Sequence, residues 1–240
     1  MNKVKRAIIM AAGYGHRMEP VTKEIPKPMV SVNGIRMIDS VIEGLIKNNI
    51  LDIYIVVGYK KEYFNQLLEE YSSININLIE NPFYDTSNNV SSLYCARNYL
   101  ENSIILDGDQ LIYDSSILSP YFNFSGYNCI WTDAPTKEWV LELDNESKIV
   151  RNCYRNGHEY GWQLYSISRW NREDGKRLKR HLEIEFEKKK NTQIYWDDVP
   201  LFCYPEEYTL GICPMEKGSV VEIDDFDELV AIDPTYCEYR

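Results

Sequence analysis

The 240-residue sequence is short of histidine, of paired cysteines and of long apolar runs. It has three histidines, and its six cysteines form no Cys-x-x-Cys pair, so neither a zinc site nor a disulfide framework is indicated. No apolar run approaches the length of a membrane span, and residues 1–6 lead into a short apolar segment rather than into a signal sequence. We therefore expect reduced thiols and a soluble, cytoplasmic protein.

Positive charge is also scarce. The sequence has 26 Lys and Arg against 37 Asp and Glu, which gives a net charge of -11. A surface of this sign repels polyanions, so binding to nucleic acid or to an anionic membrane is not expected. Any phosphate that the protein binds must be neutralised by a few local cations. The hydrophobic share of 44% suffices for a packed core, and no repeat or flexible linker divides the chain, so we predict a single domain over residues 1–240.

Apolar runs alternate with helical periodicity in the first half of the sequence. Strands are expected at 7–12, 52–59, 76–80 and 103–106, and helices at 37–46, 62–71 and 90–100. Strands separated by helices of this length indicate parallel pairing with right-handed crossovers.

The pattern changes in the second half. Short strands are expected at 129–132, 140–144, 149–154 and 160–167, followed by a charged helix over 171–190. We therefore predict an α/β fold, a Rossmann-like open mixed sheet flanked by helices, with a small antiparallel extension in the second half.

A glycine loop follows the first expected strand and leads to Arg17. Without a Cβ atom, glycines let backbone amides approach phosphate oxygens. Met18 stands where a dinucleotide fingerprint needs a third glycine, and the Gly-Lys-Ser/Thr of a P-loop is absent. Arg17 and Lys27, which lies between two prolines, remain as cations for a triphosphate. A tight turn without a ligand is the alternative. The loop consists of Ala11, Ala12, Gly13, Tyr14 and Gly15.

The order of these motifs, Ala-Ala-Gly-x-Gly-x-Arg, Pro-x-Thr and Pro-Lys-Pro, resembles the nucleotidyltransferases that activate sugar phosphates and small phosphorylated alcohols with an NTP. Within that superfamily the sequence is most similar to the bacterial CTP:phosphocholine cytidylyltransferases. The resemblance covers essentially the whole chain and implies a nucleotide-binding half at 1–110 and an acceptor-binding half at 111–240. Its further motifs are Asn88–Tyr94, Ile105–Asp109, Lys137–Trp139, Tyr195–Asp197 and Val221–Asp224.

The resemblance also implies a set of site residues. Arg17, Lys27 and Asp109 are expected to be catalytic, and Asp109 and Asp224 to hold Mg²⁺, a cation that prefers oxygen ligands. The residues themselves leave alternatives open, because Asp107 also suits a turn, Asn88 also suits a helix N-cap, and Asp225 suits the cap of a helix beginning near Phe226. The expected nucleotide-binding residues are Ala11, Ala12, Gly13, Tyr14, Gly15, Asn88, Ser92 and Asp107.

The implied reaction is transfer of CMP from CTP to a small phosphorylated or phosphonate amine, with release of pyrophosphate. The acceptor oxygen is already an anion, so no general base is required. Phosphocholine is the favoured acceptor, because aromatic rings attract a trimethylammonium group; 2-aminoethylphosphonate is close behind, with Glu138, Asp133 and Asp198 available for its ammonium. The alternatives are a sugar-1-phosphate nucleotidyltransferase and a non-catalytic module that binds a nucleotide or choline. The expected acceptor-binding residues are Trp139, Tyr195, Trp196 and Asp197.

Overall fold

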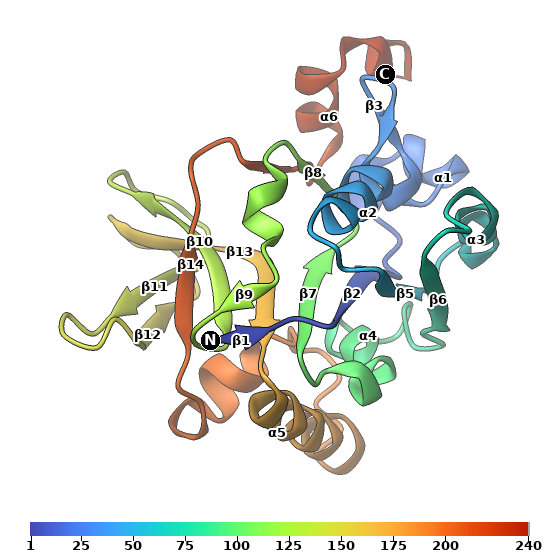
Figure 1. Cartoon of the computed structure of the whole chain (residues 1–240). Helices are drawn as coiled ribbons and strands as arrows, with labels where there is room; N and C mark the ends of the chain where they lie inside the picture. The colour runs from blue at the N-terminus through green and yellow to red at the C-terminus, as the bar shows by residue number, and fades with distance from the viewer. Residues whose placement is uncertain (240) are drawn as a thin grey trace.

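The computed structural model describes residues 1–239. Its largest element is a nine-stranded mixed sheet (Figure 1). Seven strands follow one another across the sheet, and β10 (Gly126–Thr132) adds to it by pairing with both β13 and β14 (Gly211–Pro214). The order of the seven is β12 (Val150–Tyr154), β11 (Val140–Leu143), β13 (Gly161–Trp170), β7 (Ser103–Asp107), β2 (Arg6–Ala11), β5 (Asp52–Val57) and β6 (Asn75–Glu80).

Strands β7, β2, β5 and β6 pair in parallel and form the predicted first half of the sheet. Successive side chains of a strand point to opposite faces, so Ala7 and Ile9 pack with α2 (Met37–Lys47) on one face. Ile8 packs on the other face with α4 (Val90–Cys95) and α5 (Arg172–Glu183). Helices on both faces explain why β2 is an unbroken apolar run.

The second half extends this sheet with antiparallel strands, as the sequence predicts. β13 is antiparallel to β7, with Leu106 opposite Ile167. β10 and β11 pair antiparallel with β13, and β12 pairs antiparallel with β11. β14 was not expected from the sequence; it pairs in parallel with β10. The predicted fold class, a mixed open sheet flanked by helices with an antiparallel extension, is confirmed.

Several expected helices are broken into shorter segments. The helix expected at 62–71 consists of a 3-10 helix, Lys61–Asn65, followed by α3 (Gln66–Glu70). The helix expected at 171–190 is α5, with Asn171 as its N-cap, followed by a π-helical turn at Ile184–Lys188. Asp225 caps α6 (Phe226–Ile232) as anticipated, since its carboxylate accepts a hydrogen bond from the Glu228 amide at 2.9 Å. The remaining α-helix of the described residues is α1 (Val21–Glu24).

Three short two-stranded sheets complete the fold in the described residues. The one formed by β8 (Gln110–Ile112) and β15 (Val220–Glu222) matters most for the site, because it places Glu222 opposite Gln110. This pairing brings Asp224, near the end of the chain, beside Asp109. The other two sheets are β1 (Asn2–Lys3) with β9 (Tyr121–Phe122), and β3 (Ser31–Val32) with β4 (Ile35–Arg36).

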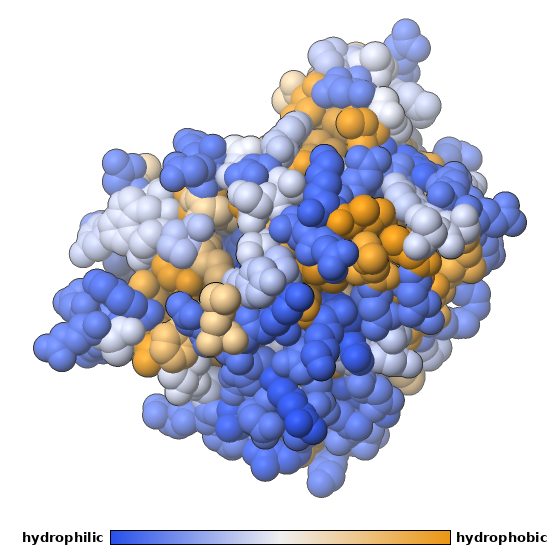
Figure 2. All heavy atoms as spheres, in the orientation of Figure 1, coloured by the Kyte–Doolittle hydropathy of each residue, from blue (hydrophilic) through white to orange (hydrophobic). Residues whose placement is uncertain are grey.

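The face of the molecule in Figure 2 is mainly hydrophilic, most evenly over its lower part, where α5 lies. Among the helices in the described residues, none has the combination of length and apolar composition needed to cross a membrane.

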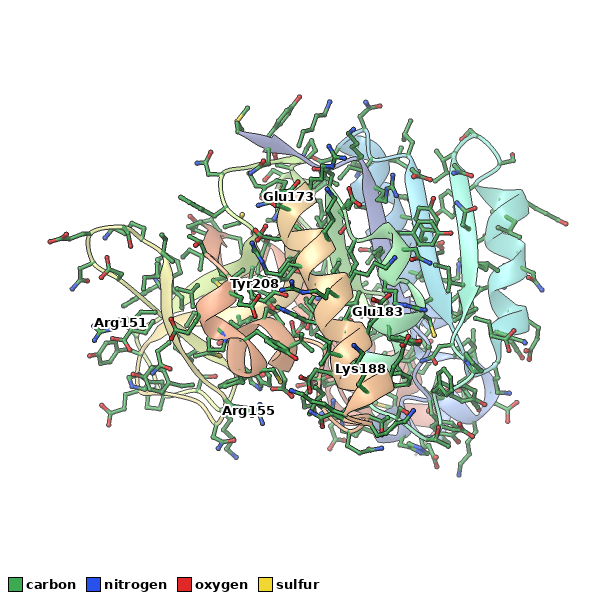
Figure 3. The ribbon with its side chains drawn as sticks, turned by 90° about the horizontal axis from the view of Figure 1, so that it is seen from below. Arg151, Arg155, Glu173, Glu183, Lys188 and Tyr208 are labelled. Atoms are coloured by element: carbon green, nitrogen blue, oxygen red, sulfur yellow. The ribbon has the colours of Figure 1, made fainter. Side chains whose placement is uncertain are left out.

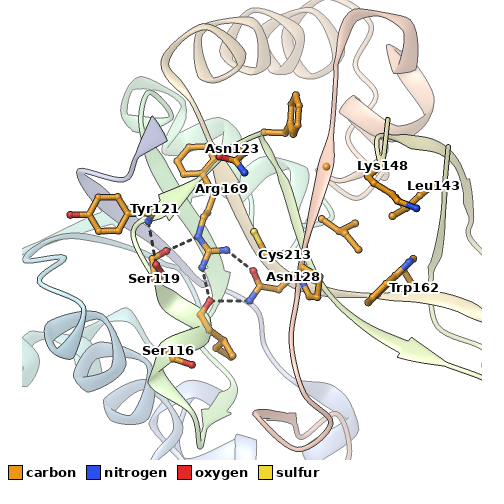
Figure 4. Close-up of a pocket in the computed structure, with 16 residues that line it drawn as sticks. Ser116, Ser119, Tyr121, Asn123, Asn128, Leu143, Lys148, Trp162, Arg169 and Cys213 are labelled. Atoms are coloured by element: carbon orange, nitrogen blue, oxygen red, sulfur yellow. Dashed lines mark hydrogen bonds between the residues drawn. The ribbon is translucent and has the colours of Figure 1, made fainter. Parts of the chain in front are cut away.

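A buried arginine links β13 to the turn after β8. Arg169, 2% exposed, donates to the carbonyl oxygens of Ser119 at 2.8 Å and Ile117 at 2.5 Å, and to Asn128 Oδ1 at 2.5 Å (Figure 4). It lines a cavity of about 570 Å³. These bonds fix the start of β10 against β13.

Candidate active site

A cavity of about 350 Å³ lies where the carboxyl ends of β2 and β7 meet. Because these strands are parallel and adjacent, with Met10 opposite Asp107, the glycine loop after β2 and the Asp107-Gly108-Asp109 turn after β7 emerge at the same edge of the sheet. This edge is where open α/β sheets bind their ligands. The cavity is lined by Arg17, Asn89, Asp107, Asp109, Glu138, Trp139, Leu164, Ser166, Tyr195, Asp197, Glu222 and Asp224.

The path of the loop after β2 requires a glycine at position 15. Gly15 has φ of +76°, and a Cβ atom there would lie 3.0 Å from Lys27 Cβ, so a side chain would displace the lysine. A Cβ atom on Gly13 would meet no atom within 4 Å, so the backbone there stays open to a ligand. Thr22 secures the loop, since its hydroxyl donates to the Gly15 carbonyl at 3.0 Å.

The two cations expected to bind phosphate, Lys27 and Arg17, form ion pairs with the carboxylates expected to hold the metal. Lys27 Nζ lies 2.5 Å from Asp109 Oδ2 and 3.4 Å from Asp224 Oδ1, and Arg17 Nη2 lies 2.9 Å from the same Asp224 oxygen. Lys27 is 8% exposed, whereas the Arg17 side chain is exposed. Four residues from four separate segments thus form one alternating chain of charges.

Carboxylates crowd the floor of the cavity. Burial raises the pKa of Asp107 well above its usual range, and the charges of Asp109, Glu222 and Asp197 add to this rise. Burial also raises the pKa of Glu222 to about 7, against a hydrogen bond from Gln110. Burial by itself lowers the pKa of Lys27, but Asp109, Asp224 and Asp107 outweigh it and raise this pKa overall. The cavity therefore disfavours further negative charge and favours cations.

Comparison with known proteins agrees with this geometry. The nucleotidyl transferase family model matches residues 6–123. The 2-aminoethylphosphonate cytidylyltransferase of Lancefieldella rimae is 38% identical over 232 residues, covering 96% of this chain and 92% of the relative. The choline-phosphate cytidylyltransferase of Streptococcus pneumoniae is 30% identical, covering 93% of this chain and 94% of the relative. The chain belongs to the cytidylyltransferases of the nucleotidyltransferase family.

A solved structure supports the same assignment over the full fold. The CTP:phosphocholine cytidylyltransferase from Streptococcus pneumoniae matches with a TM-score of 0.88 at 28% identity, covering 97% of this chain and 99% of that one. The family that the motifs of the sequence resemble is therefore confirmed.

The acidic pair of this cytidylyltransferase suits a hard divalent cation. Within residues 1–239, no group of three or more His, Cys, Asp or Glu side chains is arranged around one metal position. Asp109 and Asp224 nevertheless both direct an oxygen at the Lys27 ammonium, which shows that a cation is accommodated between them. Magnesium in nucleotide enzymes typically takes one or two carboxylates and completes its shell with phosphate oxygens and water. The residues present are thus compatible with Mg²⁺.

Two aromatic rings and two carboxylates that line the cavity of the cytidylyltransferase come from residues 138–139 and 195–197. Trp139 and Tyr195 meet edge to face with their ring centroids 5.9 Å apart. Glu138, next to Trp139, is exposed, whereas Asp197 is 7% exposed and its Oδ1 has no hydrogen-bond partner within residues 1–239. Burial raises the pKa of Asp197 to about 7.

Some expected site residues of the cytidylyltransferase lie outside this cavity. Trp196 is 2% exposed and packs in the core against Tyr127 and Trp170. Ser92 is buried and accepts a hydrogen bond from Asn81 at 3.0 Å. Asn88 donates to the Gln193 carbonyl at 3.3 Å, and its side chain does not cap α4.

Within residues 1–239, the five residues of the glycine loop are also not among those that line the cavity, although Arg17, which follows the loop, is. Ala11 and Ala12 are buried at the end of β2. Tyr14 stacks on His16 with centroids 3.9 Å apart and also contacts Tyr59. These contacts brace the loop from its outer side.

Three polar residues of the cavity were not singled out from the sequence. Asn89 accepts a hydrogen bond from the Trp196 amide at 2.8 Å, Glu222 accepts one from Gln110 at 2.7 Å, and Ser166 comes from β13. Asn89 and Glu222 belong to motifs quoted for the family, and this was the available signal. Ser166 has no such signal in the sequence, because only the antiparallel pairing of β13 with β7 places it beside Asp107.

Proposed function

We propose that this enzyme transfers CMP from CTP to the anionic oxygen of a small amine that carries a phosphonate or phosphate group. The observation that carries the proposal is the convergence of Lys27, Arg17, Asp109 and Asp224 beside the open glycine loop. In the reaction, an acceptor oxygen bonds to the α-phosphorus of CTP while the bond from that phosphorus to the bridging oxygen breaks. Pyrophosphate leaves with the electron pair, and no proton needs to be removed from the acceptor.

The chain's own residues are assigned to charge neutralisation and positioning. Lys27 holds its ammonium toward the α-phosphate, and Arg17 with the loop amides neutralises the departing pyrophosphate, both favouring the charge distribution of the transition state. Asp109 and Asp224 would hold Mg²⁺, which when bound supplies additional neutralisation of the phosphate charge.

For the acceptor, we propose a primary amine, with 2-aminoethylphosphonate ahead of phosphocholine. Within the described residues the cavity has six carboxylates and two aromatic rings on its walls. A primary ammonium donates three hydrogen bonds, which carboxylate oxygens accept, whereas a trimethylammonium group donates none. The first relative described above, an aminoethylphosphonate enzyme, is also the more similar of the two in sequence.

Phosphocholine is the second candidate, and Trp139 and Tyr195 favour it. Their edge-to-face rings offer an aromatic surface to a quaternary ammonium. The proposed ranking therefore depends on whether the buried Asp197 or the aromatic pair contributes more to acceptor binding.

Pyrophosphate release with each NTP in turn, against 2-aminoethylphosphonate, phosphocholine and a sugar 1-phosphate, tests these proposals. We expect turnover with CTP and the highest kcat/KM with 2-aminoethylphosphonate. A higher value with phosphocholine would overturn the acceptor ranking alone, and turnover with only a sugar phosphate would overturn the proposed function. CTP binding without any product would identify a binding module instead.

We also propose that the reaction takes place in the cytoplasm. All six cysteines lie in the described part of the chain as free thiols, Cys237 among them on the surface. Unpaired thiols are typical of a reducing compartment.

A further inference from the structure

Arg155 lies outside the cavity but contacts two of the segments that build its acceptor side. It follows β12, which also carries Arg151 (Figure 3). Its guanidinium centre lies 5.3 Å from the ring centroid of Trp139 and 4.4 Å from that of Phe202. Trp139 and Phe202 meet edge to face, 5.6 Å apart. Arg155 therefore contacts Trp139, which lines the cavity, without lining the cavity itself.

The same guanidinium forms an ion pair with a buried carboxylate. Arg155 Nη2 donates to Asp198 Oδ1, and Asp198 is 2% exposed. The second oxygen of Asp198 accepts a hydrogen bond from the Tyr195 amide at 2.9 Å, and the Asp198 amide donates to the Tyr195 carbonyl at 3.1 Å. Asp198 thus holds the turn that presents Tyr195 and Asp197 to the cavity.

Two of the three contacts of Arg155 bear on the aromatic pair Trp139 and Tyr195. One is a cation–π contact with Trp139, and the other reaches Tyr195 through Asp198. Removing the guanidinium would leave a buried carboxylate without its counter-charge, which is costly unless that carboxylate takes up a proton or moves. Either response weakens the bond to the Tyr195 amide.

We propose that Arg155 is a positioning residue for the acceptor, which holds Trp139 and Tyr195 in the arrangement that binds the amine. It touches neither the glycine loop nor the Lys27 charge network within the described residues. Its effect is therefore on acceptor binding and not on CTP binding. This inference rests on the proposed function for its kinetic consequence, but its structural consequence is independent of activity.

Three variants test the proposal. Arg155→Met removes the charge at similar length, Arg155→Lys keeps the charge but not the planar fork, and Arg151→Met is the matched control. Arg151 is an exposed arginine in β12, four residues earlier. Thermal melting of all three establishes that each variant is folded.

The first measurement is amide hydrogen exchange in the segment around Tyr195. We expect the Tyr195 amide to exchange about tenfold faster in Arg155→Met than in the wild type, because its acceptor Asp198 has lost its counter-charge. Arg155→Lys should fall between them, and Arg151→Met should match the wild type. Unchanged exchange in Arg155→Met would overturn the proposal even if the protein had no activity.

The second measurement is the KM for each substrate. In Arg155→Met we expect the acceptor KM to rise about tenfold, with partial recovery in Arg155→Lys, while the CTP KM stays within about twofold. Equal rises in both KM values would show general disruption and overturn the proposal. If neither amine acceptor supports pyrophosphate release by the wild type, the proposed function fails. Hydrogen exchange alone then decides the role of Arg155.

Discussion

Lys27 is a nearly buried cation whose ammonium reaches two carboxylates at once. We expect Lys27→Met to lower kcat about 10²-fold to 10³-fold, because a preorganised positive charge at the α-phosphate is lost. Lys23→Met is the matched control, since Lys23 is an exposed lysine of α1 paired with Glu19. Steady-state pyrophosphate release measures both variants. A Lys27→Met rate close to that of the control would contradict the role assigned to this residue.

Asp197 predicts a pH dependence of stability. Burial raises its pKa from 3.8 to about 7 in the folded protein, with Asp198 and Glu222 adding to the rise and Tyr127 opposing it. Between these values the folded state binds a proton that the unfolded state has lost, so the free energy of unfolding falls as pH rises. From about pH 6 to about pH 8 this group alone should lower it by about 1.4 kcal/mol.

Asp197→Asn lacks this titration, so its unfolding free energy should fall less than that of the wild type over the same interval. Urea unfolding of both proteins at the two pH values measures the difference, and carboxylates common to both cancel to first order. The same pH dependence in the two proteins would show that Asp197 is ionised in the folded state without cost.

At the scale of elements, the glycine loop and the segment carrying Lys27 are packed against each other. Gly15 combines φ of +76° with a position where a Cβ atom would lie 3.0 Å from Lys27 Cβ. Gly34, between β3 and β4, has φ of +85° with no atom within 4 Å of such a Cβ. Comparing substitutions at these two glycines therefore distinguishes the effect of backbone strain from the effect of the contact with Lys27.

Both Gly15→Ala and Gly34→Ala should lose about 1 to 2 kcal/mol of stability, the cost of a left-handed backbone with a side chain. Only Gly15→Ala should also lower kcat, by about tenfold or more, because it displaces Lys27, the cation that we propose acts at the α-phosphate. Denaturant unfolding and pyrophosphate release measure the two effects. Equal activity in the two alanine variants would show that the Lys27 position tolerates a shift of the loop.

The strands also show how much of the fold can be predicted from the sequence. Strands buried on both faces, such as β2 and β5, are apolar runs, so their positions and parallel pairing follow from hydrophobic pattern alone. β8 and β15 are three residues each, with two apolar side chains and one polar side chain, and this is too short for a periodicity to reveal them. Their pairing is what brings Asp224 beside Asp109, and the sequence indicates this proximity only through family resemblance.

Side-chain direction limited the prediction of the site in a similar way. Tyr195, Trp196 and Asp197 are consecutive, yet Trp196 points into the core while its neighbours line the cavity. Asn88 and Asn89 differ likewise, with Asn89 at the cavity. Motif matching places a segment at a site, but only the packing of the core decides which residues of that segment face the ligand.

At the scale of the whole molecule, the excess of acidic residues that gives a net charge of -11 is also found in the lining of the cavity. Among the described residues, six carboxylates line the cavity, with Arg17 lining it and Lys27 beside it as the neighbouring cations. A triphosphate that enters this cavity without a metal ion is repelled by the carboxylates. Its binding also competes with the existing ion pairs of Arg17 and Lys27. A divalent cation offsets both penalties.

We therefore expect CTP and Mg²⁺ to stabilise the protein cooperatively. Together they should raise the Tm by about 5 °C or more, while either alone should raise it by less than half as much. In Asp109→Asn the combined effect should shrink toward that of CTP alone, because one of the two carboxylate charges is lost. Thermal unfolding of the wild type and this variant, with each ligand separately and with both, measures the coupling without relying on turnover. Additive Tm shifts in the wild type would contradict it, since independent binding implies that the acidic cavity accepts a triphosphate without metal.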